Sequence, residues 1–261
     1  MKRLTHSLVI GLLLAVLSIS ASAEPKWQET LYIQKAFNEI ALKNEYRTTQ
    51  QKILKWLKPI EYEFIYHGQA HNPTIEKLFQ VQMQHLSDIT HHPIALSQYG
   101  RKPNYHIHIT SAKDYPKLVN QYRENKDPNF AQTTNCNGVY RMTKKGEIIK
   151  GDIILPIDNL YYRGKLVGCV IEESMQLMGL PNDSDWVYPS VANDLTRVEY
   201  MSGLDVVMLQ ILYHPQIKIG MSLFQSQPIV YNIIEQMKSK DGINNAERMA
   251  LQQGLFPFIN H

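Results

Sequence analysis

The side chains of this sequence that could do chemistry are concentrated in residues 172–183, which read Glu-Glu-Ser-Met-Gln-Leu-Met-Gly-Leu-Pro-Asn-Asp. Apolar residues at helical spacing predict a helix from about Gly164 to Leu180, and Glu172, Glu173 and Gln176 lie on one polar stripe of it. A carboxylate can act as a general base, and carboxylate and amide oxygens can bind a hard cation. This segment is therefore the first candidate for a functional site.

The segment resembles the active-site helix of zinc peptidases with the motif H-E-x-x-H-x-x-G-x-x-H, in which the three His bind zinc and the Glu is the general base. Aligned without a gap, Glu172, Gln176 and Asn182 stand at the positions of the three His. Glu173 stands at the general-base position, and Gly179 at the turn that ends the helix. The resemblance implies a zincin-like fold whose active-site helix lacks the zinc ligands.

Two segments further along the chain resemble the matrixin-like branch of the metzincins. Residues 201–213 are similar to the helix that follows the metzincin Met-turn, L-S-x-x-D-I-x-x-I-Q-x-L-Y, and the matching positions include Asp205 and Tyr213. Residues 189–194 occupy the place of the Met-turn itself, but Ala192 stands where its methionine would be.

Most of residues 50–222 also resembles, in element order, a family of uncharacterised bacterial exported proteins and lipoproteins. That family shows an E-E-x-x-Q-x-L-G-L-x-N-D core, a following S-x-x-N-D and a closing L-Y-x-P-x-x-x-x-G-M. Here these motifs read from Glu172 to Asp183, from Ser190 to Asp194 and from Leu212 to Met221. The resemblance implies that the loss of zinc ligands is a trait of the family, and it names no reaction.

The ligand chemistry of the segment argues against zinc. A catalytic zinc site needs three protein ligands, mostly imidazoles, and an open position for water. Glu172, Gln176 and Asn182 offer one carboxylate and two amide oxygens, which suit calcium or magnesium better than zinc. Without any ion, the same side chains can satisfy one another by hydrogen bonds. We predict no cofactor and no zinc-peptidase activity, with a hydrogen-bonded polar cluster as the simplest arrangement.

Two classes of function remain open for the cleft around these side chains. In the first, the protein binds a peptide, protein or glycan of the cell envelope. The residues predicted to contact that ligand are Gln176, Asn182, Asp183, Asn193 and Asp194. In the second, a metal-free or non-zinc hydrolase acts on cell-envelope material, with Glu173 as general base and Glu172 or Asp183 assisting. An open acidic cleft would favour the hydrolase, and a cleft filled by Trp186 or by the C-terminal tail would favour the binder.

Ten histidines are present, so chance pairs are common, and surface or core histidines are the simpler interpretation. One sharper hypothesis concerns His108, which lies on a predicted strand. In zincin-like sheets the edge strand borders the cleft, so His108 could contribute to a pocket built around Glu173.

Hydrophobic periodicity predicts the elements that must position the site. Predicted helices cover residues 27–57 (broken near Asn44), 72–89, 111–122, 164–180 and 203–213, with two more in the tail. Predicted strands cover residues 60–66, 105–110, 138–143 and 148–156, the last two as a hairpin. This order predicts an α/β fold, a zincin-like mixed sheet with helices packed on it.

Cys136 and Cys169 are the only cysteines. In an oxidising compartment an isolated pair is expected to be bridged, and the alternative is two buried small apolar residues. A bridge would tie the helix that carries Glu172 and Glu173 to the segment around Asn135.

The N-terminus has the order of a secretory signal peptide. Lys2 and Arg3 precede an apolar run over residues 8–19, and Ser20-Ala21-Ser22-Ala23 forms an A-x-A-like cleavage site. The run is shorter than the about 20 residues that a membrane span needs. We expect cleavage after Ala23 and a periplasmic or secreted mature protein without a membrane span.

About 238 residues remain after cleavage, and the formal charge falls from +3 to +1. This near-neutral balance and the absence of basic runs exclude a nucleic-acid partner. We predict a signal peptide (1–23), an N-terminal helical segment (24–58), a zincin-like domain (59–222) and a C-terminal helical tail (223–261).

Overall fold

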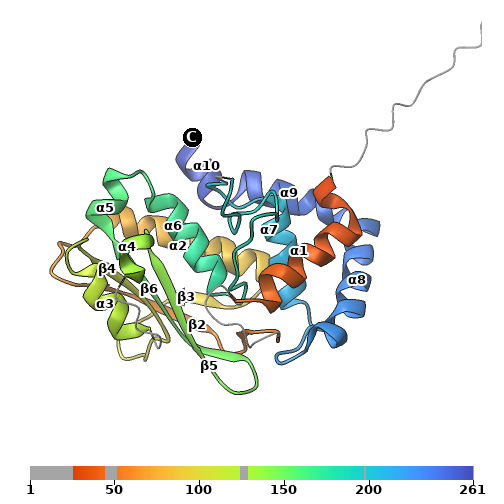
Figure 1. Cartoon of the computed structure of the whole chain (residues 1–261), viewed down its shortest axis with the longest axis horizontal. Helices are drawn as coiled ribbons and strands as arrows, with labels where there is room; N and C mark the ends of the chain where they lie inside the picture. Colours follow the sequence, from red (N-terminus) through yellow and green to blue (C-terminus); the bar gives the residue numbers. More distant parts are fainter. Residues whose placement is uncertain (1–25, 45–51, 124–128, 197, 261) are drawn as a thin grey trace, which may run out of the picture.

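A computed structural model describes residues 26–44, 52–123, 129–196 and 198–260 of the chain. The fold is a mixed α/β arrangement, in which helices pack on a sheet (Figure 1). The predicted signal peptide lies outside the described residues. Among the described helices, none has the length and apolar character needed to cross a membrane.

The described strands are β1 (Lys55–Trp56), β2 (Ile60–Tyr66), β3 (Ile94–Leu96), β4 (Tyr105–Thr110), β5 (Asn137–Met142) and β6 (Glu147–Pro156). The longer helices are α1 (Thr30–Leu42), α2 (Pro73–Thr90), α3 (Tyr115–Tyr122), α6 (Leu166–Gln176), α7 (Gly203–Tyr213), α8 (Leu223–Ser239) and α9 (Gly242–Gln252). Short helical segments are η1 (Lys26–Gln28), α4 (Phe130–Thr133), α5 (Ile157–Tyr162) and α10 (Leu255–Asn260).

The sheet is parallel except at one edge. Its strand order is β1-β6-β4-β2-β3, and all of these neighbours pair in parallel. β5 pairs antiparallel with β6, its hairpin neighbour, and with no other described strand. A parallel sheet requires helical crossovers between strands, and α2 and α3 lie in such connections.

The alternation of side chains separates the two faces of the sheet. Phe64, Ile107 and Ile153 are in register on one face, where Phe64 contacts Phe79 of α2 at a ring distance of 6.0 Å. The neighbouring positions, such as Ile154, face the other way and pack under α3. The face with Ile153 also carries α6, so α2 and α6 share one side of the sheet.

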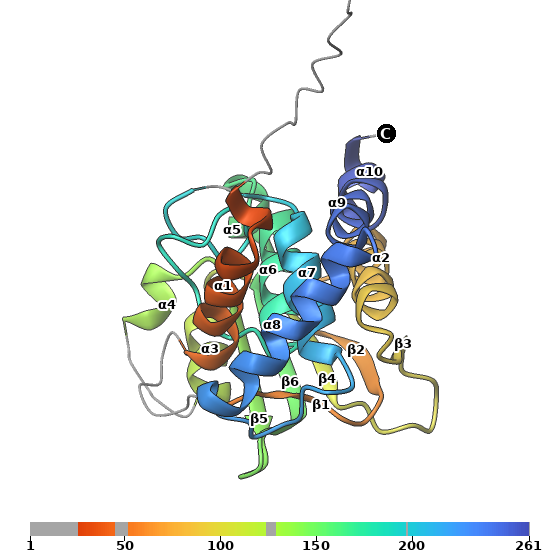
Figure 2. The ribbon, with the colours of Figure 1, turned by 90° about the vertical axis from the view of Figure 1, so that its right-hand side faces the viewer.

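The C-terminal half adds a helical layer beside α6. α7 is buried around most of its circumference, and it contacts α1, α2, α8 and α9 (Figure 2). Its N-terminus is fixed by Asp205, a fully buried carboxylate that accepts hydrogen bonds from Ser190 Oγ (2.5 Å) and Ser202 N (2.8 Å). Burial raises the pKa of Asp205, and these hydrogen bonds oppose the increase. The carboxylate therefore attaches the 190–191 turn to α7.

Most predicted elements are confirmed, several of them with identical bounds, but two predicted helices end early. The helix predicted over residues 27–57, with a break near Asn44, ends at Leu42, and residues 45–51 lie outside the described chain. Lys55–Trp56, predicted as helix, instead form β1, which pairs with the first residues of β6. The helix predicted to reach Leu180 ends at Gln176. Gly179 has a φ of +113°, which is not a helical conformation and which favours glycine. A Cβ there would collide with the carbonyl oxygen of Leu54, so position 179 requires glycine.

The predicted disulfide is confirmed. Cys136 and Cys169 are bonded, with 6.1 Å between their Cα atoms, and the bond connects the residue before β5 to α6.

We predict that replacing both cysteines by alanine lowers the free energy of unfolding by about 3–4 kcal/mol, because the bond closes a long loop of the unfolded chain. The two half-cystines are 33 residues apart in sequence. Urea unfolding of the mature protein, with and without reductant, measures the effect. Equal unfolding midpoints for the oxidised protein and the Cys136→Ala/Cys169→Ala variant would contradict it.

Candidate functional site

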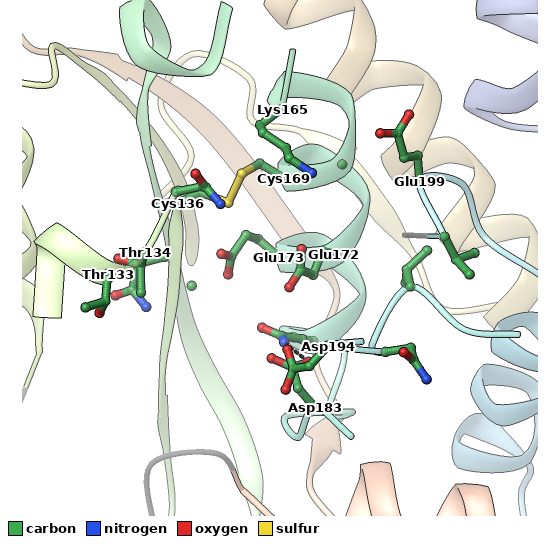
Figure 3. A pocket seen from close by; sticks show the side chains of 18 of the residues that line it. Thr133, Thr134, Cys136, Lys165, Cys169, Glu172, Glu173, Asp183, Asp194 and Glu199 are labelled. Atoms are coloured by element: carbon green, nitrogen blue, oxygen red, sulfur yellow. Dashed lines mark hydrogen bonds between the residues drawn. A yellow bond between two sulfur atoms is a disulfide. The ribbon is translucent and has the colours of Figure 1, made fainter. Parts of the chain in front are cut away.

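A cavity of about 340 Å³ lies along α6 (Figure 3). One wall is the segment 133–138, which leads into β5, and another is the loop 191–199 before α7. Figure 3 shows Lys165 and Glu199 toward one end of the cavity, and Asp183 and Asp194 toward the other. None of the lining residues among those described comes from the C-terminal tail, and Trp186 is not among them.

Six of the seven predicted catalytic and ligand-contacting residues line this cavity. They are Glu172, Glu173, Gln176, Asp183, Asn193 and Asp194. The structure therefore brings together side chains from α6, from the turn after it and from the next loop.

The seventh residue, Asn182, is directed elsewhere. Its side-chain amide donates to the carbonyl oxygens of Glu39 (3.2 Å) and Asp183 (2.6 Å), and its backbone N–H donates to Ile40 O (3.3 Å). The last carbonyls of a helix lack partners within the helix. Asn182 donates hydrogen bonds to two of these carbonyls at the end of α1, those of Glu39 and Ile40. The three positions aligned with the zinc ligands therefore do not converge on one point.

Gln176 is also hydrogen-bonded within the chain. Its Nε2 donates to Asp183 Oδ1 at 2.7 Å. This bond holds the turn after α6 against the last turn of the helix. The predicted network joined Glu172, Gln176 and Asn182; the structure instead pairs Gln176 with Asp183, while Asn182 is bonded to α1 and to the backbone of Asp183.

Glu173 is buried against the edge strand, with 6% of its surface exposed. A Cβ placed on Gly138 of β5 would lie 2.6 Å from Glu173 Oε2, so the carboxylate approaches the strand as closely as a glycine allows. Glu172, its neighbour, is half-buried. The two carboxylates thus differ in burial although both line the cavity.

Asn193 holds the loop around it by hydrogen bonds to the backbone. Asn193 Oδ1 accepts from the backbone N–H groups of Leu195 (3.0 Å) and Thr196 (2.7 Å), and its Nδ2 donates to Val187 O (2.8 Å). Asp194 is exposed at the rim, and its pKa is raised by partial burial and by the charge of Asp185. Asn193 therefore shapes the wall, while Asp194 presents its charge to the opening.

The described lining carries five carboxylates and one lysine. The acidic residues are Glu172, Glu173, Asp183, Asp194 and Glu199, and the lysine is Lys165. Glu172, Glu173 and Asp183 each also interact with other groups of the chain. Within the described residues, no group of three or more His, Cys, Asp or Glu side chains has a geometry that could hold a metal ion.

Sequence reasoning missed Asn137, which lines the cavity and is 3% exposed. Its Oδ1 has no hydrogen-bond partner among the described residues. A buried acceptor without a partner costs free energy that a ligand donor can recover. The sequence could have indicated Asn137 through the predicted disulfide, because a bond between Cys136 and Cys169 places residues 135–138 beside α6.

The hypothesis that His108 joins the cavity is wrong. His108 is in register with Ile154, on the sheet face opposite α6, and is 1% exposed. Its two ring nitrogens contact His67 Nε2 (2.9 Å) and Asp152 Oδ1 (3.1 Å). Burial would raise the pKa of Asp152, but the contacts of His106 and His108 and the charge of Lys150 hold it well below its usual value.

The fold and the cavity define a mixed α/β protein with a polar cleft between a buried helix and an antiparallel edge strand. Residues 30–232 match the family described as protein of unknown function (DUF2927), and the chain belongs to that family. No curated protein matches the chain, and no solved structure matches it. The matched region begins at the first residue of α1 and ends within α8.

We predict that Gly138→Ala displaces the Glu173 carboxylate and lowers the free energy of unfolding by about 1–3 kcal/mol, as overpacking typically does. The added Cβ would lie 2.6 Å from Glu173 Oε2. Chemical denaturation measures the loss.

Gly168→Ala is the matched control. Gly168 lines the same cavity from α6, and a Cβ there meets nothing within 4 Å. Alanine favours a helix over glycine by about 1 kcal/mol, so this variant should be as stable as the parent or more so. If Gly138→Ala were as stable as Gly168→Ala, the close approach of Glu173 to β5 would be wrong.

Proposed function

We propose that this protein is exported and that the cleft between α6 and β5 binds a peptide or glycan of the cell envelope without zinc. The observation that carries the proposal is a polar cavity of about 340 Å³ in which the buried Asn137 acceptor has no described partner. Its volume falls in the range of ligand sites, about 300–1,000 Å³. Asp194 and Glu199 line the cavity and are exposed, so the cavity is open to solvent on their side.

Export is supported by the signal-type order of residues 1–23 and by the disulfide, since such bonds persist in oxidising compartments. A periplasmic or secreted location gives the cleft access to polymers of the cell envelope.

A zincin-like origin for the cleft is supported by the position of α6, which packs against the edge strand of the sheet. α6 carries Glu173 beside an antiparallel edge strand of an otherwise parallel sheet. The side chains at the ligand positions are amides and one carboxylate, a set that suits calcium or magnesium better than zinc. Gln176 is hydrogen-bonded to Asp183, and Asn182 to α1. We therefore propose a ligand-binding site that needs no cofactor.

We predict that Asp194→Lys combined with Glu199→Lys changes the affinity of the mature protein for purified peptidoglycan at least ten-fold, because it reverses the charge at the rim of the cavity. Co-sedimentation with insoluble peptidoglycan, which contains both peptide and glycan, measures the change. Asp88→Lys is the control, since Asp88 is exposed on α2 and does not line the cavity. No sedimentation of the parent protein, or equal sedimentation of all variants, would contradict the proposal.

A second candidate function is a metal-free hydrolase of cell-envelope material. The specific observation in its favour is that the cavity is acidic and is filled neither by Trp186 nor by the described tail. Glu173 is buried and Glu172 is half-buried, so neighbouring carboxylates occupy different environments. Adjacent residues of a helix project about 100° apart, so these two do not face each other. Carboxylates in different environments can divide the roles of base and acid, with Glu172 or Asp183 assisting Glu173.

If the cleft hydrolyses envelope material, Glu173→Gln should reduce the rate by about 10²–10⁴-fold, which is the usual contribution of a general base. Release of dye from labelled peptidoglycan measures the rate. Glu147→Gln is the control, because Glu147 lies in the β5–β6 hairpin and does not line the cavity. A rate that is unchanged in Glu173→Gln would exclude this role for Glu173.

A further inference from the structure

A second cavity, of about 330 Å³, lies between α1, the loop after α6 and the start of α8. The polar lining residues are Lys35, Asn38 and Glu39 of α1 and Lys43 directly after it, and the apolar ones are Leu42, Trp186 and Leu223. None of them lines the first cavity. This second cavity is therefore a separate candidate site.

Trp186 presents an aromatic surface to solvent at this cavity, with 43% of the residue exposed. The ring is held in place by Tyr32, whose ring meets it edge-on at a centroid distance of 5.7 Å. The Tyr32 hydroxyl also donates to Tyr188 O (2.7 Å) and accepts from Tyr188 N (2.9 Å). The loop and its indole are thus positioned before any ligand arrives, which lowers the entropic cost of binding.

Polar groups of α1 and of Lys43 line the same cavity as the indole. Asn38 Oδ1 is shielded from solvent and has no hydrogen-bond partner among the described residues. Glu39 and Lys43 form an ion pair of 2.7 Å, which leaves further donor and acceptor positions on both groups. The cavity therefore combines a flat apolar surface with hydrogen-bonding groups that can both donate and accept.

This combination fits a sugar ring better than the alternatives. The C–H groups on one face of a pyranose can lie on the negative face of an indole, while its hydroxyls reach donors and acceptors at the edge. An apolar peptide side chain would leave Asn38 Oδ1 without a partner. A cation over the indole would be repelled by Lys35 and Lys43, which outnumber the one carboxylate of Glu39.

We propose that this second cavity binds one pyranose ring of a neutral or anionic glycan, stacked on Trp186 and hydrogen-bonded to Asn38. The site is distinct from the cleft along α6, so it does not depend on the function proposed for that cleft.

Tryptophan fluorescence of the mature protein tests the site directly. The chain has three tryptophans. Trp56 is 1% exposed with its Nε1 bonded to Leu177 O (2.8 Å), and Trp27 is partly exposed but does not line this cavity, so an emission change that is lost in Trp186→Ala reports on this site. The probes are a β-1,4-linked N-acetylglucosamine tetrasaccharide, a β-1,4-linked glucose tetrasaccharide and a uronic-acid-containing tetrasaccharide. We expect a saturable change in emission with at least one of them.

Calorimetric titration with variants then locates the binding. Trp186→Ala should weaken binding of that tetrasaccharide at least ten-fold, and Asn38→Leu several-fold, while circular dichroism checks that both variants are folded at the temperature of the titration. Tyr162→Ala is the control, because Tyr162 is 91% exposed and does not line this cavity.

Two outcomes would overturn the proposal: no saturable binding of any of the three tetrasaccharides, or equal binding by the parent protein and Trp186→Ala. Binding of an uncharged apolar tripeptide that is lost in Trp186→Ala, without binding of any sugar, would overturn it as well.

Discussion

The close approach of α6 to the antiparallel edge strand is the constraint on which the candidate site depends. The Cys136–Cys169 bond fixes the segment before β5 to the helix, and Gly138 allows the Glu173 carboxylate to sit against the strand. Any side chain at position 138 would separate the two elements or turn Glu173 away. This contact therefore sets the distance between α6 and the wall formed by residues 133–138, through one covalent bond and one missing methyl group.

The turn after α6 explains why the side chains aligned with zinc ligands do not converge. α6 ends at Gln176, the backbone at Gly179 passes close to Leu54 O, and the chain then meets the last carbonyls of α1, where Asn182 is hydrogen-bonded. Gln176 is satisfied by Asp183. Each amide that aligns with a zinc ligand thus has a partner within the chain. Amides can do this because they donate and accept at once, whereas a carboxylate can only accept.

Local patterns predicted the elements that are long and periodic. β2, β4 and α7 have the predicted bounds, because alternation or helical spacing runs through each of them. β1 was missed because its two residues form a strand only by pairing with β6, about ninety residues away in sequence. Asn182 and His108 were misplaced for the same reason. The partner of Asn182 is the end of α1, and the face on which His108 lies is set by the register of β4 with β6.

The N-terminal and C-terminal helices belong to the functional unit as much as the sheet does. α1 receives the Asn182 amide and packs on α7 and α8, so it holds the turn that carries Asp183 into the first cavity. The same helix supplies most of the polar groups around Trp186 in the second. Asp183 and Trp186 are three residues apart on one loop. A change in the position of α1 would therefore alter both cavities together.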